Sequence, residues 1–306
     1  IRFQQKKKQA MNLILMEFSF NLKSLLLIKI KMLITAHLMG GLGNQLFQIF
    51  ATIAYSFTNK IPFTFPRLKD SKEAQYRQTV YWDNFLSNLS KFTYKGIKPL
   101  QIYRERKFTY EELPTKNIPQ QGFKLFGYFQ SEKYFKSQYE NIIKFIGLRK
   151  QQEKIIVPEN CISLHFRIGD YVLPQFKDAH PLMPLNYYIS ALNKILLGKV
   201  SQKWNVLYFC QKQDNNIVEK KITILKEKFP ELTFIKASDE KEDWEQMLMM
   251  SCCEHNIIAN SSFSWWGAYF NGNKDKIVCY PSVWFGPKLA NKDTSDLCPK
   301  KWYKIT

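Results

Sequence analysis

Several patterns that would assign this chain to a function class are missing. It has no Asp-x-Asp pair, the arrangement with which many enzymes hold a divalent ion against a diphosphate, so no metal site of that kind is expected. Its six cysteines follow no metal-ligand spacing, and no zinc-finger, helix-turn-helix or ribonucleoprotein signature occurs. Internal repeats and long low-complexity segments are also missing. These absences argue against a structural metal site, a repeat protein and a sequence-specific nucleic-acid binder.

The cysteines are expected to be buried free thiols. Cys161, Cys210 and Cys279 lie in apolar runs typical of strands, and Cys252 and Cys253 lie in a Met-rich run typical of a helix. Because a free cysteine behaves as a small apolar residue, we favour burial over a disulfide framework.

The charge is strongly basic but unevenly distributed. Residues 1–31 hold seven cations and one glutamate, which supply +6 of the formal net charge of +19. The remaining cations are interleaved with Asp and Glu. A basic enzyme with an anionic nucleotide substrate explains this balance as well as a nucleic-acid binder does. We expect no nucleic-acid partner, and an RNA-binding protein is the alternative from another class.

Residues 1–31 are expected to lie outside the fold. Residues 12–30 are fairly apolar, but Glu17, Lys23 and Lys29 interrupt them. Because a membrane-spanning helix needs about 20 mostly uncharged residues, this segment is a weak signal-anchor candidate. The alternative is an extension upstream of a working start at Met32.

From Met32 onward, strand and helix patterns alternate. The first half predicts a strand over 33–38, a helix over 44–57, a strand over 123–126, a helix over 132–146 and an irregular region over 60–120. Residues 147–160 are polar and predict a linker. The second half predicts strands at 161–167, 204–210, 232–236, 255–259 and 276–280, and helices near 184–198, 214–228, 241–253 and 262–271. This alternation indicates an α/β protein with parallel sheets, in two Rossmann-like lobes (residues 32–150 and 151–306) that face a cleft.

The segment His165–Tyr171 carries the first candidate site. It follows an apolar run typical of a buried strand, whose alternation places His165, Arg167 and Gly169 on one face. A guanidinium binds phosphate oxygens in a bidentate manner, and a glycine lets the backbone approach a ligand. The pattern predicts a diphosphate site at the carboxyl end of a strand. The alternative is an ion pair between Arg167 and Asp170 that only stabilises a loop.

The segment Gly40–Gln45 follows the first predicted strand and opens a helix. Gly41 and Gly43 permit close approaches that side chains prevent, and the amino end of a helix attracts anions. The dinucleotide fingerprint is incomplete, since Leu46 stands in place of its third glycine. We predict a tight turn against a ligand or another domain, with a simple turn capped by Asn44 as the alternative.

The segment Asn260–Ala268 closes a predicted strand and opens another helix. Asn260, Ser261 and Ser262 offer an amide, two hydroxyls and the free N–H groups of a helix start, which suit a phosphate or a ribose. The alternative is a serine cap followed by core tryptophans. For Trp265 and Trp266 we favour the core.

In this order, these motifs resemble those of the galactoside α-1,2-fucosyltransferases, glycosyltransferase family 11. That family has a Gly-rich segment that ends in Gly-Asn-Gln, a His-x-Arg-x-Gly-Asp-Tyr motif and an Asn-Ser-Ser-Phe-Ser-Trp-Trp-Gly-Ala segment. The matching segments here are Gly41–Gln45, His165–Tyr171 and Asn260–Ala268, and Gly127–Ser131 and Asp243–Met247 resemble two further blocks. The resemblance runs from about Met32 to the end of the chain.

The resemblance implies an inverting glycosyltransferase of the GT-B type, with no cofactor and no essential metal, that moves L-fucose from GDP-fucose to the 2-hydroxyl of a terminal β-galactoside. It implies an acceptor-side first lobe and a second lobe that binds GDP-fucose, with Arg167 on the donor diphosphate. Asp170 is the first candidate for the catalytic base and His165 the second. The other expected donor contacts are Gly41, Gly43, Asn44, Gly169, Asn260, Ser261 and Ser262.

Other functions remain open at this point. A protein O-fucosyltransferase, another GDP-sugar transferase or a non-catalytic glycan-binding protein would share part of this pattern. Acceptor recognition is expected within residues 60–120. An anchor at residues 12–30 would imply a Golgi-like membrane location, and without one a soluble cytoplasmic location is expected.

Overall fold

The computed structural model describes residues 32–67, 81–94, 100–198 and 203–306. The anchor candidate at residues 12–30 lies outside these ranges and stays a prediction. Within the described ranges, no helix is both long enough and apolar enough to cross a membrane.

A three-stranded parallel sheet organises the first lobe, in the order β1 (Leu33–Ala36), β5 (Gly122–Phe126) and β4 (Gln101–Arg104). Helix α2 (Leu42–Asn59) follows β1 and is buried along most of its length. The region expected to be irregular contains β4 and a short parallel pair, β2 (Phe65–Pro66) and β3 (Thr93–Tyr94). Strand β4 lies at the sheet edge with most of its residues exposed, so it carries no apolar pattern.

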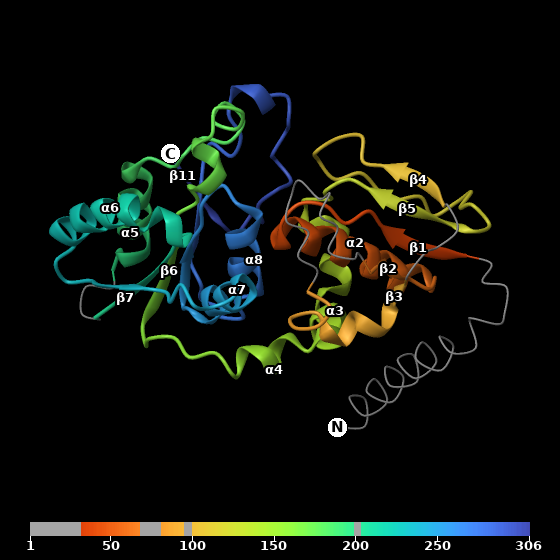
Figure 1. Ribbon diagram of the computed structural model, residues 1–306, viewed down its shortest axis with the longest axis horizontal. Coiled ribbons are helices and arrows are strands. Elements are labelled where there is room, and N and C mark those ends of the chain that lie inside the picture. The colour runs from red at the N-terminus through yellow and green to blue at the C-terminus, as the bar shows by residue number, and fades with distance from the viewer. Residues whose placement is uncertain (1–31, 68–80, 95–99, 199–202) are drawn as a thin grey trace.

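A six-stranded parallel sheet organises the second lobe (Figure 1). Its order is β11 (Tyr303–Ile305), β10 (Val278–Pro281), β9 (His255–Ile257), β6 (Cys161–His165), β7 (Asn205–Phe209) and β8 (Thr233–Lys236). Its helices are α5 (Leu185–Leu196), α6 (Asn215–Lys228), α7 (Asp243–Cys252) and α8 (Ser262–Phe270). The predicted α/β fold with parallel sheets is confirmed.

Helices α7 and α8 lie between the second sheet and the first lobe, whereas α5 and α6 cover the opposite face of that sheet (Figure 1). The rings of Trp265 and Trp266 are fully buried, and they pack against Phe47 and Phe50 of α2 at centroid distances of 4.5 and 4.6 Å. The hydrophobic core of the first lobe therefore continues into the second lobe through α8. The strands of the two sheets lie on either side of residue 150, but the core does not divide there, and the predicted domain boundary stays a prediction.

Several predicted elements differ in their bounds, among them the following three. The helix expected over 132–146 begins as two 3₁₀ turns and becomes α3 only at Tyr139–Ile146. The expected linker contains a short helix, α4 (Leu148–Gln152), after Gly147 ends α3 with a φ of 71°. The strand expected over 161–167 ends at His165, because the chain then turns into the 3₁₀ segment η4 (Gly169–Val172).

Candidate functional site

The strand order of the second sheet reverses between β6 and β9. Strands β6, β7 and β8 follow one another in one direction, and β9, β10 and β11 are added on the other side of β6. Ligands of open parallel sheets bind at the carboxyl ends of the strands beside such a reversal. His165 ends β6 and Asn260 lies just after β9, so two of the predicted motifs meet there.

Arg167 lies just beyond the end of β6 and forms an ion pair with Asp170. Its guanidinium carbon also lies 4.9 Å from the ring centroid of Tyr171. The hydroxyl of Tyr171 donates a hydrogen bond of 3.1 Å to the carbonyl oxygen of Asn260. The Arg167 side chain is still 24% exposed, so the charge is held in place and remains accessible to a ligand. Sequence reasoning assigned no role to Tyr171, which here joins the two motifs.

Gly169 adopts a φ of 42°, a conformation that residues with side chains rarely take. A Cβ at this position would collide with the Gln211 side chain and lie 3.3 Å from Nη1 of Arg167. The backbone N–H of Gly169 donates a 2.9 Å hydrogen bond to the buried carboxylate of Asp214. Asp214 therefore fixes the turn that presents Arg167, and no motif in the sequence pointed to it.

His165 and Asn260 each bury a polar atom that has no hydrogen-bond partner among the described residues, Nδ1 of His165 and Oδ1 of Asn260. The Asn260 amide is oriented by its Nδ2 group, which donates to the carbonyl oxygens of Pro181 and Trp284 at 2.9 and 3.2 Å. Buried polar atoms without partners are rare in proteins, and a bound ligand can satisfy them. Both atoms belong to the edge where the strand order reverses.

The imidazole of His165 is neutral at physiological pH. Its ring lies 5.6 Å from that of Phe263, and burial, with a smaller contribution from the charge of Arg167, lowers its pKa to about 3. A group with this pKa accepts a hydrogen bond but is a weak proton acceptor in catalysis.

The glycine-rich turn of the first lobe packs directly against the start of α8. Ser262 Oγ donates a 2.7 Å hydrogen bond to Asn44 Oδ1, which also accepts one of 2.7 Å from Nε2 of Gln130. A Cβ on Gly43 would lie 2.6 Å from the carbonyl oxygen of Ser262, so a side chain is excluded there. The predicted tight turn is present and packs against the start of α8, and the alternative of a cap by Asn44 is wrong because α2 begins at Leu42 with Gly41 as its N-cap.

The start of α8 has the serine cap and the core tryptophans of the second interpretation of its motif, and its role as a phosphate or ribose site stays a prediction. Ser261 is the N-cap, and its side chain accepts a 3.3 Å hydrogen bond from the N–H of Phe263. Trp266 Nε1 donates a 2.9 Å hydrogen bond to the carbonyl oxygen of Gly43. The two tryptophans are core residues, as favoured from the sequence. Gly41 is exposed, and a Cβ there would meet no atom of the described residues within 4 Å.

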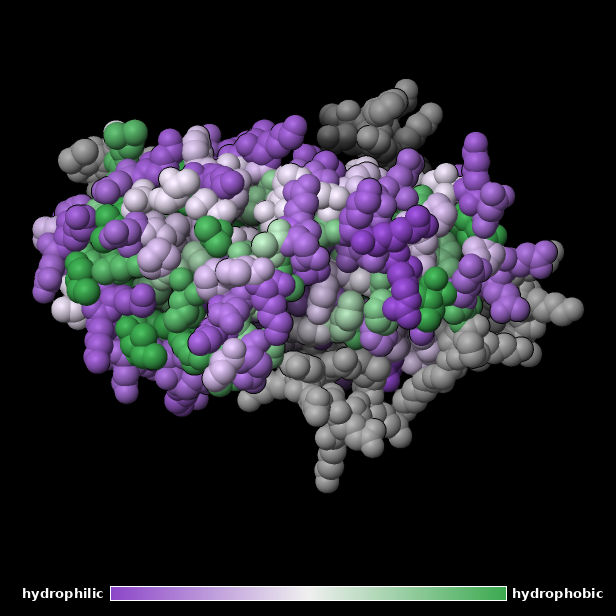
Figure 2. Space-filling view, turned by 90° about the horizontal axis from the view of Figure 1, so that it is seen from above, coloured by the Kyte–Doolittle hydropathy of each residue, from purple (hydrophilic) through white to green (hydrophobic). Residues whose placement is uncertain are grey.

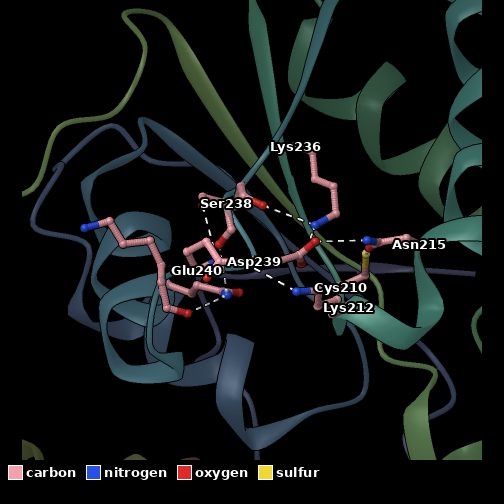
Figure 3. Close-up of polar contacts among 10 residues, drawn as sticks. Cys210, Lys212, Asn215, Lys236, Ser238, Asp239 and Glu240 are labelled. Carbon is pink, nitrogen blue, oxygen red and sulfur yellow. Dashed lines mark hydrogen bonds and ion pairs between the residues drawn. The ribbon is translucent and has the colours of Figure 1, made fainter.

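Further polar residues follow the same sheet edge at the ends of β7 and β8 (Figure 3). Lys236 forms an ion pair with Asp239, whose other carboxylate oxygen accepts a 2.9 Å hydrogen bond from Asn215. Cys210 donates through its sulfur to Oδ1 of Asn215 at 3.3 Å. Lys236 lowers the pKa of Asp239 by hydrogen bonding to the charged carboxylate. These contacts hold the loop after β8 in place beside the candidate site.

The cysteines and the surface agree with the composition. All six cysteines are free, and four are buried as predicted, whereas Cys252 and Cys298 are only half-buried. Among the described residues, no group of three His, Cys, Asp or Glu side chains could hold a metal ion. Viewed from above, the molecule presents mostly hydrophilic side chains interspersed with apolar ones (Figure 2).

Comparison with known proteins identifies the family. The sequence model of glycosyl transferase family 11 matches residues 2–305. The chain belongs to glycosyl transferase family 11. The match begins at residue 2 and therefore includes the segment that was expected to lie outside the fold. The family assignment from the three motifs is confirmed, and the chain is a glycosyltransferase.

Two curated relatives come from Escherichia coli. The O-antigen biosynthesis glycosyltransferase WbnK is 28% identical over 304 residues, which cover 85% of this chain and 97% of WbnK. An alpha-1,2-colitosyltransferase is 27% identical over 310 residues, which cover 89% of this chain and 99% of that protein. Because both relatives are bacterial, they lend no support to a Golgi-like location.

Solved structures with a similar arrangement are more distant in sequence. A structure of Arabidopsis thaliana FUT1 in complex with GDP is 11% identical and matches with a TM-score of 0.47, over 89% of this chain and 75% of that one. The fucosyltransferase NodZ from Bradyrhizobium is 10% identical and matches with a TM-score of 0.45, over 78% of this chain and 93% of NodZ. The two parallel α/β sheets are those of the GT-B type expected from the motifs.

Proposed function

We propose that this chain transfers L-fucose from GDP-fucose to the 2-hydroxyl of a terminal β-galactoside, with inversion at C1 of the fucose. In this proposal residues 151–306 bind the donor, and residues 32–150 form the acceptor side. The single observation that carries it is the convergence of Arg167 with the unpartnered polar atoms of His165 and Asn260 beside the reversal of strand order.

The donor contacts follow from the chemistry of these groups. Arg167 binds the diphosphate, because its charge and planar donor geometry match phosphate oxygens. Gly169 lets the diphosphate approach the backbone. His165 and Asn260 accept hydrogen bonds from hydroxyl groups of GDP-fucose. Ser261, Ser262, Asn44 and Gly41 form the wall that faces the donor where the lobes join, whereas Gly43 is buried against the Ser262 backbone and supports this wall.

Inversion requires one displacement, in which the acceptor hydroxyl attacks C1 of the sugar as GDP leaves. Arg167 stabilises the charge that develops on the departing phosphate. Asp170 takes the proton of the acceptor hydroxyl, since the pKa of His165 is too low for that task. The step needs no metal in this proposal, because Arg167 and the free N–H groups at the start of α8 oppose the phosphate charge.

The deciding experiment is incubation with GDP-fucose and a panel of β-galactosides in the presence of EDTA, followed by linkage analysis of the product by NMR. Arg167→Ala should lower transfer by a factor of about 10³ or more while the protein remains folded. Arg67→Ala is the matched control, because it removes another Arg–Asp pair, Arg67–Asp83, at 2.7 Å on the first lobe. Near-normal transfer by Arg167→Ala would remove this arginine from the donor site.

A second donor deserves a parallel test, because one relative is an alpha-1,2-colitosyltransferase that is 27% identical. The same panel is therefore incubated with GDP-colitose. A higher kcat/KM with the colitosyl donor than with GDP-fucose would reassign the transferred sugar. The phosphate contacts would be the same for both donors.

A further inference from the structure

Three neighbouring strands of the first sheet end in a stack of planar side chains. His37 follows β1, Phe126 ends β5 and Arg104 ends β4. The His37 and Phe126 rings are stacked with centroids 4.9 Å apart and planes 19° apart, and the Arg104 guanidinium carbon lies 4.4 Å from the Phe126 centroid. The register produces this row, because Arg104 pairs with Phe126 and Ala36 pairs with Leu125.

The stack is accessible from solvent. His37 and Arg104 are exposed, and Phe126 is half-buried beneath them. Burial and the charge of Lys124 lower the pKa of His37, so its imidazole is neutral at physiological pH and can both donate and accept a hydrogen bond. Planar rings beside fixed hydrogen-bond donors suit a sugar, whose C–H face packs on a ring while its hydroxyls bind the polar edges.

Two loops connect this stack with the proposed donor site. The loop after His37 leads to the exposed Gly41 and to Gly43, which packs against the backbone of Ser262. The loop after Phe126 ends in Gln130, which donates to Asn44 at 2.7 Å.

Glu105 fixes the second of these loops. Its carboxylate accepts hydrogen bonds from the backbone N–H groups of Tyr128 and Phe129 at 2.7 and 2.9 Å. Phe129 has a φ of 53°, so these bonds also hold an uncommon backbone conformation. The stack is therefore held in a defined place relative to the start of α8.

We propose that His37, Phe126 and Arg104 form the acceptor subsite, which binds the terminal β-galactoside that receives the transferred sugar. This inference rests on the proposed function. The acceptor packs against the stack at the carboxyl edge of the first sheet, with its reactive hydroxyl directed over Gly41 toward the second lobe. The stack makes the site selective for a hexopyranose as acceptor. The residues proposed to contact GDP-fucose lie on the other lobe.

The test measures acceptor and donor binding separately, with lactose as the acceptor probe. Saturation-transfer NMR and titration give the affinity for lactose in the presence of saturating GDP, and calorimetry gives the affinity for GDP alone. His37→Ala and Arg104→Ala should each weaken lactose binding, and raise the KM for lactose, by about tenfold. Their affinity for GDP should stay within about twofold of the wild-type value, since the donor groups are untouched.

Arg106→Ala is the matched control, because it removes an exposed cation of the same segment that lies outside the stack. It should leave lactose binding unchanged. His37→Gln, which keeps a polar side chain, should recover part of the affinity lost in His37→Ala.

The outcomes separate this inference from the proposed function. Wild-type protein that binds GDP but not lactose, or variants of His37 and Arg104 that bind lactose as the wild type does, would overturn the acceptor subsite and leave the donor site standing. An equal loss in Arg106→Ala would assign the effect to general charge and would also overturn it. Protein that binds no GDP would contradict both.

Discussion

Ser262 Oγ donates a hydrogen bond of 2.7 Å to Asn44 Oδ1, although the two residues are 218 positions apart in the chain. Each belongs to a motif that looks like an independent helix start in the sequence. In the structure the two helix starts face each other, and their glycine and serine residues form one junction between the lobes. The proposed donor site is therefore coupled to the first lobe by direct packing.

The first prediction concerns the glycines of this junction. Gly43→Ala should lower the free energy of unfolding by about 1–3 kcal/mol, because its Cβ would overlap the Ser262 backbone and overpacking has this cost. Gly41→Ala should cost less than about 1 kcal/mol, because its Cβ would meet nothing within 4 Å and only the N-cap preference changes. Urea denaturation of both variants checks the difference. Equal losses would show that α8 does not press on Gly43.

The second prediction concerns the indole N–H of Trp266. Trp266→Phe removes its 2.9 Å hydrogen bond to the Gly43 carbonyl oxygen and should lower the free energy of unfolding by about 1–3 kcal/mol, because a buried acceptor loses its partner. Trp82→Phe is the control, since the indole nitrogen of the buried Trp82 has no hydrogen-bond partner in the part of the chain that the structure describes. Thermal unfolding should therefore show a larger decrease for Trp266→Phe. The opposite ranking would assign the effect to ring volume.

The third prediction is a pH dependence of stability caused by His165. Burial lowers its pKa to about 3 from the ordinary value of 6.5, so between these values the unfolded chain binds a proton that the folded chain does not. The contribution of the neutral His165 ring to the free energy of unfolding is therefore complete above pH 6.5. It is lost as the pH falls from 6.5 toward 3. From pH 8 to pH 5 this loss is about 2 kcal/mol.

His165→Asn should remove that part of the pH dependence. Urea denaturation at pH 8 and at pH 5 measures it as a difference in the free energy of unfolding. His37→Asn should remove a smaller part of the slope, because the pKa of His37 is also lowered, by partial burial and by the charge of Lys124. A slope that is unchanged in His165→Asn would mean that the ring is solvated in the folded protein.

The fourth prediction concerns Asp170, which is both the partner of Arg167 and the proposed base. Asp170→Asn keeps an oxygen that can accept a hydrogen bond from Arg167, but an amide cannot take a proton at neutral pH. We expect kcat to fall by about 10²–10⁴ while the Kd for GDP changes little. Calorimetry and steady-state kinetics measure the two quantities. A weaker affinity for GDP with a normal kcat would make Asp170 a positioning residue for Arg167.

Much of the second lobe was predictable, because its elements have strong local patterns. The strand at Cys161–His165 and the helix at Asp243–Cys252 lie within two residues of their expected positions. The edge strand Gln101–Arg104 was not predicted, because its residues are mostly exposed and show no apolar pattern. The role of Asp214 was not predicted either, since it depends on a hydrogen bond from Gly169, which is 45 positions away in the chain.

The sequence by itself determined the family, the candidate phosphate ligand, the free state of the cysteines and the burial of Trp265 and Trp266, because these depend on residue type and on short-range spacing. Only the tertiary structure decided that the strand order reverses between β6 and β9, and that Asn44 meets Ser262. It also decided that His37 and Arg104 stack on one phenylalanine. Parallel strand pairing and lobe packing join residues that are far apart in the chain, and no local pattern encodes which partners will meet.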